Sequence, residues 1–411
     1  MESATQKWNH SVFSLLYLFF IYAILYLLHS NVLLPHESHL LLRIKKNPPH
    51  PLRFRPDGTF KILQVADLHY GNGPTSRCRD IPISGFRHCS DLNSTWFLRR
   101  MIQAENPDFI AFTGDNIFGS SATDAAESLF GAFRPAMESG IPWAAILGNH
   151  DQESTMNREE LMSFISLLDY SVSQINPSVE ELSNAAKTGK RETIDGFGNY
   201  NLRVFGAPGS HLANSSVLNL FFLDSGDRET VKGIRTYGWI KESQLRWLYY
   251  ASKRSQGPKK CTNRSLSPLT LPTPPALAFF HIPIPEVRQL YYKTFIGQFQ
   301  EAVACSSVNS GVLQTLVSMG DVKGVFMGHD HKNDFCGNLD GIWFCYGGGF
   351  GYHGYGKYGW PRRARVILAE LGKGENAWMG VEQIKTWKRL DDDNFSKIDE
   401  QILWSSDHGR E

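Results

Sequence analysis

The chain has 411 residues, of which 42% are hydrophobic and 20% charged, as is ordinary for a folded globular protein. Its 42 Lys and Arg residues balance 41 Asp and Glu residues, so no net basic charge draws it toward nucleic acid, and we expect no nucleic-acid partner. This length can hold two average domains or one large α/β domain.

The N-terminal segment is strongly apolar. Residues 12–28 read VFSLLYLFFIYAILYLL, which is long for a signal-peptide core and slightly short for a membrane span. No small-x-small cleavage motif follows, so a cleaved signal peptide and an uncleaved signal anchor are both predicted as alternatives for residues 1–30. This segment is the only expected contact with a membrane. A buried core helix is a third interpretation, disfavoured by the lack of an amphipathic pattern. Residues 31–56 are predicted to be a linker, and residues 57–411 a single globular domain.

Glycosylation motifs agree with entry into the secretory pathway. Because chance matches are common, the motifs only support this localisation. We therefore expect an extracellular, secreted glycoprotein. The Asn-x-Ser/Thr motifs begin at Asn93, Asn214, Asn263 and Asn394.

One pair among the six cysteines has the spacing of a disulfide across a hairpin. Cys336 and Cys345 flank Asp340-Gly341, a dipeptide that favours a two-residue hairpin turn. Counting outward from the turn places the cysteines opposite each other as a non-hydrogen-bonded pair, with Cα atoms about 4.5 Å apart. This separation permits a disulfide, and two buried free thiols are the alternative.

The first half of the globular part alternates between strands and helices. This β-α-β-α-β order predicts a parallel sheet with crossover helices. The helix after the first strand is expected to be capped near Asn93 or Ser94 and to run to Pro107, and the next to cover about residues 122–139, with Gly140 ending it. The three strands are expected at residues 60–66, 108–114 and 143–148.

The second half is expected to add further strands and one clear helix, at residues 242–254. The basic, Pro-rich stretch Ser255–Pro275 is interpreted as a surface loop. The strands at residues 341–349 and 363–371 are expected to close the domain. Strands are predicted at residues 217–224, 276–280, 322–328, 341–349 and 363–371.

Five short motifs of metal-ligand type follow the predicted strands. In open α/β sheets, ligands bind at the carboxyl ends of strands, so we expect these residues to meet at one edge. Each motif alone is a weak signal, and the alternative is scattered surface polar residues. The motifs are Asp67-Leu-His69, Gly114-Asp115, Gly148-Asn149-His150-Asp151, His281 and Gly328-His329-Asp-His331.

These residue types suit a centre of two metal ions. Two cations about 3.5–4 Å apart need a shared anionic ligand, and Asp115 is predicted to bridge them. Imidazole and carboxylate ligands favour Fe, Mn or Zn. A hydroxide held between the metals would attack phosphorus, and His150 would protonate the leaving group. The first site would be completed by Asp67, His69 and His331, and the second by Asn149, His281 and His329.

The motifs resemble the calcineurin-like metallophosphoesterase superfamily from about Phe60 to Leu368. The stretches KILQVADLHYG, GDNIF, YGWI and GHDHK are similar to the short plant branch of the purple acid phosphatases, whose members are often labelled probable inactive. This resemblance implies an α/β fold, a four-layer αββα sandwich, with residues 57–411 as the catalytic domain. It also implies hydrolysis of phosphomonoesters at mildly acidic pH by two metal ions, Fe with Zn or Mn.

One position departs from the coloured members of that family. They have a Tyr three residues after the bridging Asp, and its phenolate on ferric iron gives the purple colour. Here the position is Phe118, which cannot ligate, and His69 stands where those members have Gly. In other superfamily members an Asp at this position orients the catalytic His. Asp151 or a loop residue is a possible substitute.

Alternative functions remain open from the sequence. A phosphodiesterase or nucleotidase could use the same centre, and a catalytically weak metal-binding protein would fit Phe118. His353, in a Gly-rich loop after a strand, is a candidate substrate contact at the rim. The expected partner is a phosphate-ester substrate, and the oligomeric state is undetermined, with a homodimer one option.

Overall fold

The computed structural model describes residues 2–28, 45–82, 86, 88–178, 193–256, 273–375 and 377–406. The chain divides into two compact units, Met1–Ile44 and Lys45–Glu411. Asn263, much of the predicted linker and most of the predicted loop 255–275 lie outside the described residues.

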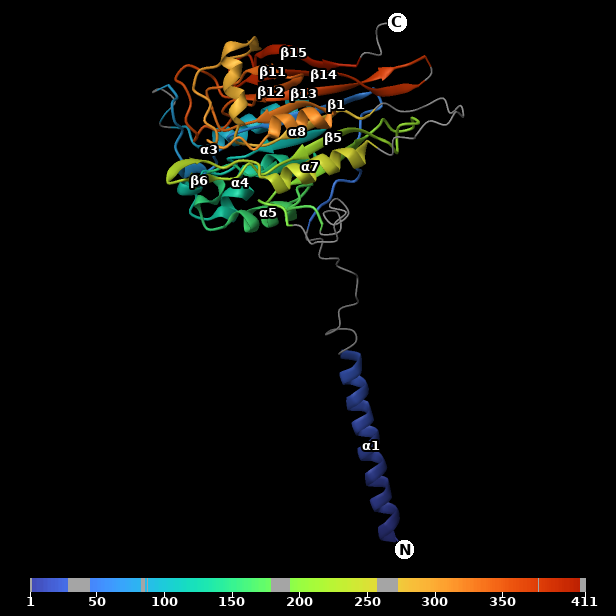
Figure 1. The fold of residues 1–411 in the computed structure, drawn as a ribbon. Helices are drawn as coiled ribbons and strands as arrows, with labels where there is room; N and C mark the ends of the chain where they lie inside the picture. Colours follow the sequence, from blue (N-terminus) through green and yellow to red (C-terminus); the bar gives the residue numbers. More distant parts are fainter. Residues whose placement is uncertain are drawn as a thin grey trace. The chain divides into compact units, whose positions relative to one another are not determined.

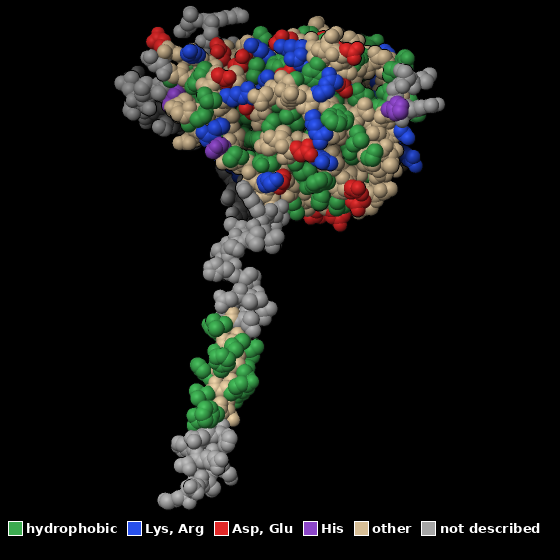
Figure 2. Space-filling model, turned by 180° about the vertical axis from the view of Figure 1, so that it is seen from behind, with side chains coloured by type: hydrophobic (Ala, Val, Ile, Leu, Met, Phe, Trp, Pro, Cys, Tyr) green, Lys and Arg blue, Asp and Glu red, His purple; other side chains and the backbone are tan. Residues whose placement is uncertain are grey.

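The first unit contains one helix, α1 (Glu2–Leu28). Its large apolar side chains between residues 12 and 27 are exposed and form a continuous hydrophobic surface along the helix (Figure 2). Within the described part of the chain, no helix is both long enough and apolar enough to cross a membrane.

The second unit begins earlier than expected. Leu52 and Phe54 are buried, and the backbone N–H of Phe54 donates to the carbonyl of Phe205 over 2.8 Å. Residues 45–56 therefore belong to the compact unit and not to the predicted linker, because their apolar side chains enter its core.

A six-stranded sheet contains the predicted β-α-β-α-β unit. Its order is β15-β14-β13-β1-β2-β3, and β1, β2 and β3 are parallel, as predicted. The prediction that the strand at residues 363–371 closes the domain is wrong, because β14 and β15 continue the sheet beyond it in antiparallel pairing. The strands are β1 (Thr59–Val65), β2 (Phe109–Thr113), β3 (Trp143–Ile146), β13 (Arg363–Lys373), β14 (Trp378–Leu390) and β15 (Lys397–Ser405).

The helices between these strands begin at polar caps. The predicted cap of the first, near Asn93 or Ser94, is wrong by three or four residues. Ser90 is the N-cap, and the Asn93 side chain accepts its backbone N–H. The second ends at Gly140 as predicted, in the left-handed conformation that glycine adopts easily. The helices are α3 (Asp91–Glu105), α4 (Ala125–Ser139) and α5 (Arg158–Leu167).

A seven-stranded sheet forms the other half of the unit, in the order β4-β5-β8-β10-β12-β11-β9. Its four central strands, β5, β8, β10 and β12, are parallel. A separate hairpin, β6 (Arg228–Val231) with β7 (Ile234–Tyr237), precedes α7. The remaining elements are β4 (Tyr200–Phe205), β5 (Ser216–Phe222), β8 (Ala276–Phe279), β9 (Phe295–Ile296), β10 (Val322–Met327), β11 (Cys336–Leu339), β12 (Ile342–Tyr346), α7 (Glu242–Ser255) and α8 (Val312–Met319).

The two sheets pack face to face with helices outside them (Figure 1). Between the sheets, the Phe222 ring meets the Phe109 ring at 6.2 Å, and the Tyr200 hydroxyl donates to the carbonyl of Ala145 over 2.7 Å. On the outer face of the first sheet, Phe133 of α4 packs edge-on against Phe112 of β2. The predicted four-layer αββα sandwich is therefore confirmed.

Two disulfides are present in the described residues. Cys336 and Cys345 are opposite each other in the β11–β12 register and are bonded, with Cα atoms 4.1 Å apart, as the hairpin pattern predicts. A second bond, Cys78–Cys89, was not predicted. Cys305 is buried and bonded to no described cysteine.

Candidate dinuclear metal centre

The predicted ligands follow the carboxyl ends of strands from both sheets. Asp67 lies just after β1, Asp115 after β2 and His281 after β8. Because the parallel strands of the two packed sheets end at the same edge of the sandwich, residues far apart in sequence meet there. The arrangement predicted from strand ends is therefore the one observed.

Four of these residues have a left-handed backbone. The φ angles of Asp67, His69, Asp115 and His329 are 55°, 47°, 47° and 80°. Non-glycine residues seldom adopt this conformation, which costs about 1–3 kcal/mol at each position and persists only where surrounding contacts hold it. These turns redirect the chain so that the side chains point into the site.

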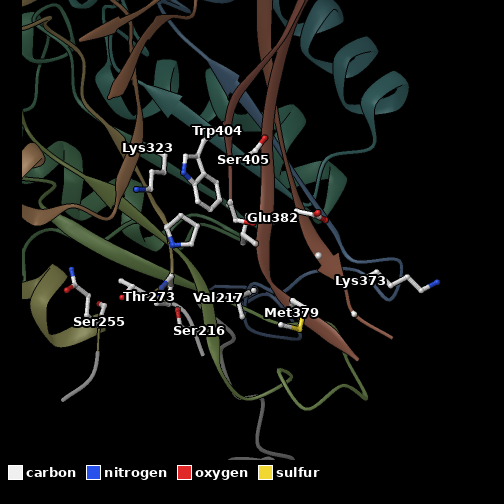
Figure 3. A pocket seen from close by; sticks show the side chains of 18 residues that line it. Ser216, Val217, Ser255, Thr273, Lys323, Lys373, Met379, Glu382, Trp404 and Ser405 are labelled. Carbon is white, nitrogen blue, oxygen red and sulfur yellow. The ribbon is translucent and has the colours of Figure 1, made fainter. Parts of the chain in front are cut away.

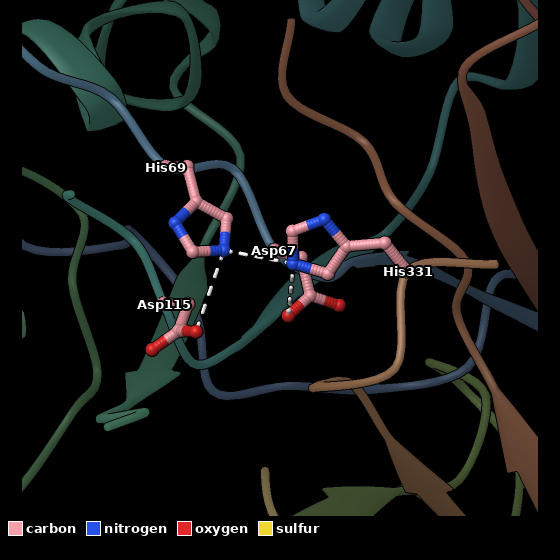
Figure 4. Close-up of side chains that lie close together, drawn as sticks. All are labelled: Asp67, His69, Asp115 and His331. Carbon is pink, nitrogen blue, oxygen red and sulfur yellow. Dashed lines mark hydrogen bonds and ion pairs between the residues drawn. The ribbon is translucent and has the colours of Figure 1, made fainter. Parts of the chain in front are cut away.

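The first group of ligands is compact and buried. One donor atom from each of its four residues lies within 4.8 Å of the other three. The Nε2 atoms of His69 and His331 are 2.9 Å apart, and His331 Nε2 lies 3.6 Å from Asp67 Oδ1 (Figure 4). The group consists of Asp67, His69, Asp115 and His331.

The second group shares Asp115 with the first. It consists of Asp115, His281 and His329, again with donor atoms within 4.8 Å of one another. Asp115 Oδ2 is 3.3 Å from His281 Nε2 and 3.4 Å from His69 Nε2, so one oxygen faces both groups. Asn149 Oδ1 lies 3.3 Å from His281 Nε2, which places it beside this second group.

Hydrogen bonds behind the ligands fix their orientation. His281 Nδ1 is 2.9 Å from the carbonyl of Thr113, and His331 Nδ1 is 2.7 Å from that of Tyr355, so each ring donates Nδ1–H and directs Nε2 into the site. Asp115 Oδ1 accepts the backbone N–H of His150 over 2.8 Å, which leaves Oδ2 for the shared position. Such outer bonds are typical of metal-binding histidines and carboxylates.

Glycines allow the motifs to approach this closely. A Cβ at Gly148 would lie 2.1 Å from Asp115 Oδ1, and one at Gly114, where φ is +90°, would lie 2.5 Å from His281 Nδ1. Both distances are far below van der Waals contact. The glycines before Asn149 and Asp115 are therefore part of the site's construction.

The protonation states of the buried groups follow from burial and charge. Burial lowers the pKa of His69 and of His329 well below the ordinary value, and that of His331 to about 3, so these rings are neutral, as ligands must be. Burial disfavours the ionised form of Asp115, but His281 and His69 outweigh it and its pKa falls well below the ordinary value. Burial would lower the pKa of His281, but Asp115 raises it to about 9, so a metal bound there must displace a proton.

His150 lies just outside the ligand groups. Its ring centroid is 5.3 Å from that of His69 and 4.8 Å from that of Phe118. Asp151 does not orient this ring: its carboxylate accepts the backbone N–H groups of Gly148 and Ile117 and so braces the loop. The carboxylate that contacts the ring of His150 is that of Glu153, with Oε2 2.8 Å from Nδ1.

Comparison with known proteins identifies the family. The model of the calcineurin-like phosphoesterase family matches residues 60–333, a range that includes both ligand groups. The chain belongs to this family.

Relatives of this phosphoesterase include plant and yeast proteins. "Probable inactive purple acid phosphatase 28" of Arabidopsis thaliana is 63% identical over 99% of this chain and 98% of its own length. "Probable inactive purple acid phosphatase 29" of the same plant is 52% identical over 86% of this chain and 88% of its own. "Phosphatase DCR2" of Saccharomyces cerevisiae is 35% identical over 81% of this chain and 54% of its own. The chain is therefore of the purple acid phosphatase type.

Solved structures also align with this phosphoesterase. A dimetal phosphatase from Danio rerio aligns with a TM-score of 0.48 and 14% identity, over 84% of this chain and 99% of that chain. A purple acid phosphatase from yellow lupin (Lupinus luteus) seeds aligns with a TM-score of 0.46 and 11% identity, over 86% of this chain and 55% of that chain.

The remaining predicted residues of this phosphoesterase lie at the rim or on the surface. His353 Nδ1 is 2.6 Å from the carbonyl of Arg77, and its ring lies 5.6 Å from that of Phe118. Asn214 and Asn394 are exposed, as acceptors for glycans must be. The first of the four motifs, at Asn93, lies in the first turn of α3.

A separate cavity of about 690 Å³ lies away from the predicted ligands (Figure 3). Its walls include Ser216 and Val217 at the start of β5, Pro275 just before β8, and Trp404 of β15. Because the predicted ligands follow the carboxyl ends of strands and this cavity lies at the amino ends of β5 and β8, the two are at opposite edges of the second sheet.

Proposed function

We propose that this phosphoesterase hydrolyses phosphomonoesters at a centre of two metal ions. The observation that carries the proposal is the sharing of one buried carboxylate, Asp115, by two groups of ligand atoms. A shared anion is what two neighbouring cations require. The substrate class comes from the family and its phosphatase-named relatives.

The donor set fits metal ions. Asp67 Oδ2 and His329 Nε2 are buried and have no hydrogen-bond partner among the described residues. The Nε2 atoms of His69 and His331 face each other over 2.9 Å, and His331 presents a lone pair there because its Nδ1–H is donated to the carbonyl of Tyr355. Unpartnered buried polar atoms cost free energy, and a cation would satisfy them. Nitrogen and oxygen donors favour Fe with Zn or Mn.

The first site would be formed by Asp67, His69, Asp115 and His331, and the second by Asp115, Asn149, His281 and His329. When bound, the two ions would lower the pKa of a water molecule enough to make it a nucleophile at phosphorus. His150, outside both groups, gives a proton to the leaving-group oxygen as its bond to phosphorus breaks. His353 is a candidate contact to the organic part of the ester, since its ring lies across Phe118 from His150.

Metal content and hydrolysis test the proposal together. The full chain should hold about two metal ions and hydrolyse a generic aryl phosphate faster than the corresponding diester. A chain with two ions that cleaves only the diester would replace the phosphatase by a phosphodiesterase or nucleotidase. A chain that binds no metal would refute the proposal.

A second candidate is a catalytically weak metal-binding protein. It is favoured by Phe118 at the position of the family's Tyr and by the names of the Arabidopsis relatives, which include the words "probable inactive". It predicts two bound ions with turnover close to that of the metal ions alone. The His150→Ala variant separates the two, because only a true phosphatase loses rate when its proton donor is removed.

We further propose that the protein enters the secretory pathway through residues 1–30 and carries glycans. Two disulfides in the described residues support this, because such bonds persist in oxidising compartments.

A further inference from the structure

The ring of His150 is held on its Nδ1 side by a carboxylate from its own loop. Glu153 Oε2 lies 2.8 Å from His150 Nδ1, and each side chain is 24% exposed. Glu153 ends the short 3₁₀ helix Asp151–Glu153, so it returns to the ring within one turn of the chain. A carboxylate accepts but does not donate, so Nδ1 carries the proton of this hydrogen bond.

Glu153 is itself fixed from two other elements. Arg228, at the start of β6, places Nη1 2.9 Å from Glu153 Oε1 and donates from the same atom to the carbonyl of Asn149 over 2.7 Å. On the other side, Gly119 approaches so closely that a Cβ there would lie 2.8 Å from the backbone nitrogen of Glu153. The carboxylate therefore has one oxygen for Arg228 and the other for His150.

The opposite side of the ring carries Nε2, which faces Arg228. With Nδ1–H donated to Glu153, Nε2 is an acceptor, and Arg228 Nη2 lies 3.2 Å from it. The ring also contacts Phe118 and His69, which limit its rotation.

We propose that Glu153 is the positioning residue of His150, an inference that rests on the proposed function. Glu153 holds the proton on Nδ1 and so directs Nε2 toward the leaving group. Before the reaction Nε2 takes up a proton from solvent, so that both ring nitrogens are protonated. That proton passes to the leaving-group oxygen as the P–O bond breaks, Nε2 keeps the electron pair of its N–H bond, and the ring returns to the form with its proton on Nδ1. Glu153 keeps its negative charge throughout and takes no proton. The substrate replaces the guanidinium of Arg228 at Nε2.

The kinetic test uses aryl phosphates with different leaving groups. Glu153→Ala should lower kcat about 10–100-fold for phenyl phosphate, which needs a proton donor, and by less than about threefold for dinitrophenyl phosphate, which does not. KM should stay nearly unchanged. Glu153→Gln, which keeps an acceptor oxygen, should recover most of the rate. Glu229 is next to Arg228 on the β6–β7 hairpin, and its carboxylate pairs with Lys241 at the start of α7. Glu229→Ala should therefore leave kinetics unchanged.

A double variant shows whether Glu153 acts through His150. If it does, His150→Ala with Glu153→Ala should be no slower than His150→Ala alone. A double variant more than tenfold slower would overturn the proposal, as would equal losses for good and poor leaving groups. A loss of kcat in Glu229→Ala as large as that in Glu153→Ala would also overturn it. The removal of any negative charge at the rim of the site would then explain the effect.

A spectroscopic test does not depend on turnover. In the zinc-loaded full chain, the nitrogen-15 shifts of His150 should show a single tautomer with the proton on Nδ1, and Glu153→Ala should give a mixture or the other tautomer. An unchanged tautomer in Glu153→Ala would refute the positioning role even in an active enzyme. A wild-type chain that hydrolyses no ester but shows the tautomer change would refute the proposed function and leave the role of Glu153 in place.

Discussion

Replacing Asp115 by Asn should remove metal and activity together. The carboxylate is fully buried between the two ligand groups, and its Oδ2 lies 3.3–3.4 Å from one nitrogen of each. Asn keeps the size of the side chain and can keep the hydrogen bond to the backbone N–H of His150, so the loop should fold as before. The change therefore isolates the negative charge.

The expected loss follows from Coulomb's law. Two unit charges about 4 Å apart attract by roughly 4 kcal/mol at an effective dielectric constant of about 20. Losing that much for each ion weakens its binding about a thousandfold, and a doubly charged ion would lose more. Because the same residue faces both groups, both ions should be lost in parallel.

Two measurements test this prediction. Mass spectrometry gives the metal content after dialysis against a metal buffer, and hydrolysis of an aryl phosphate gives the activity. Asp124→Asn is the matched control, because Asp124 caps α4 and Asn caps a helix equally well. An Asp115→Asn protein that holds two ions at wild-type affinity would refute the bridging assignment. Loss of one ion with full retention of the other would show that Asp115 serves a single site.

Three further outcomes are expected. His150→Ala should keep both ions and lose about 10²–10⁴-fold in rate, and wild-type turnover in this variant would exclude His150 as the proton donor. The purified protein should show no strong visible absorption band even after oxidation, since Phe118 supplies no phenolate. An intense band would mean that a tyrosine ligates iron. The Phe118→Tyr variant should add colour if iron occupies the first site. Protein made through the secretory route should lose mass on removal of N-linked glycans. Changing Asn214 and Asn394 to Gln should remove most of that mass shift. If both residues carry no glycan in such protein, the glycan assignment is contradicted.

The sequence predicts which side chains meet at this edge because each of them follows a strand that is easy to recognise. Apolar runs such as residues 108–114 end in ligand-type residues, and parallel strands must end at the same edge. The hairpin disulfide is predictable for a similar reason, since a local turn fixes the register of Cys336 and Cys345. Cys78–Cys89 has no such turn, so its pairing depends on how the surrounding loop folds.

Strands β14 and β15 were missed because their pattern is mixed. Lys388 of β14 is fully buried, and its amine lies 2.6 Å from both Asp334 and Asp399. A lysine in the middle of a strand indicates an exposed position unless its partners are known, and Asp334 is 54 residues away.

The contacts around His150 are only partly predictable from the sequence. Glu153 lies three residues after His150, a spacing that suits one turn of helix and could have drawn attention to it. Arg228 is 78 residues from His150 on a hairpin with exposed strands, and no local signal connects the two.

The left-handed backbone at four of the predicted ligands would link the stability of this protein to the proposed metal binding. Each such residue costs about 1–3 kcal/mol that glycine would not incur, so four of them cost roughly 4–12 kcal/mol, a large part of the net stability of a typical domain. Glycine at Asp67, His69, Asp115 or His329 would relieve this strain and abolish a ligand in the same step. A descendant of this chain that does not need to bind metal would therefore gain stability by replacing these four residues with glycine. This chain retains all four side chains.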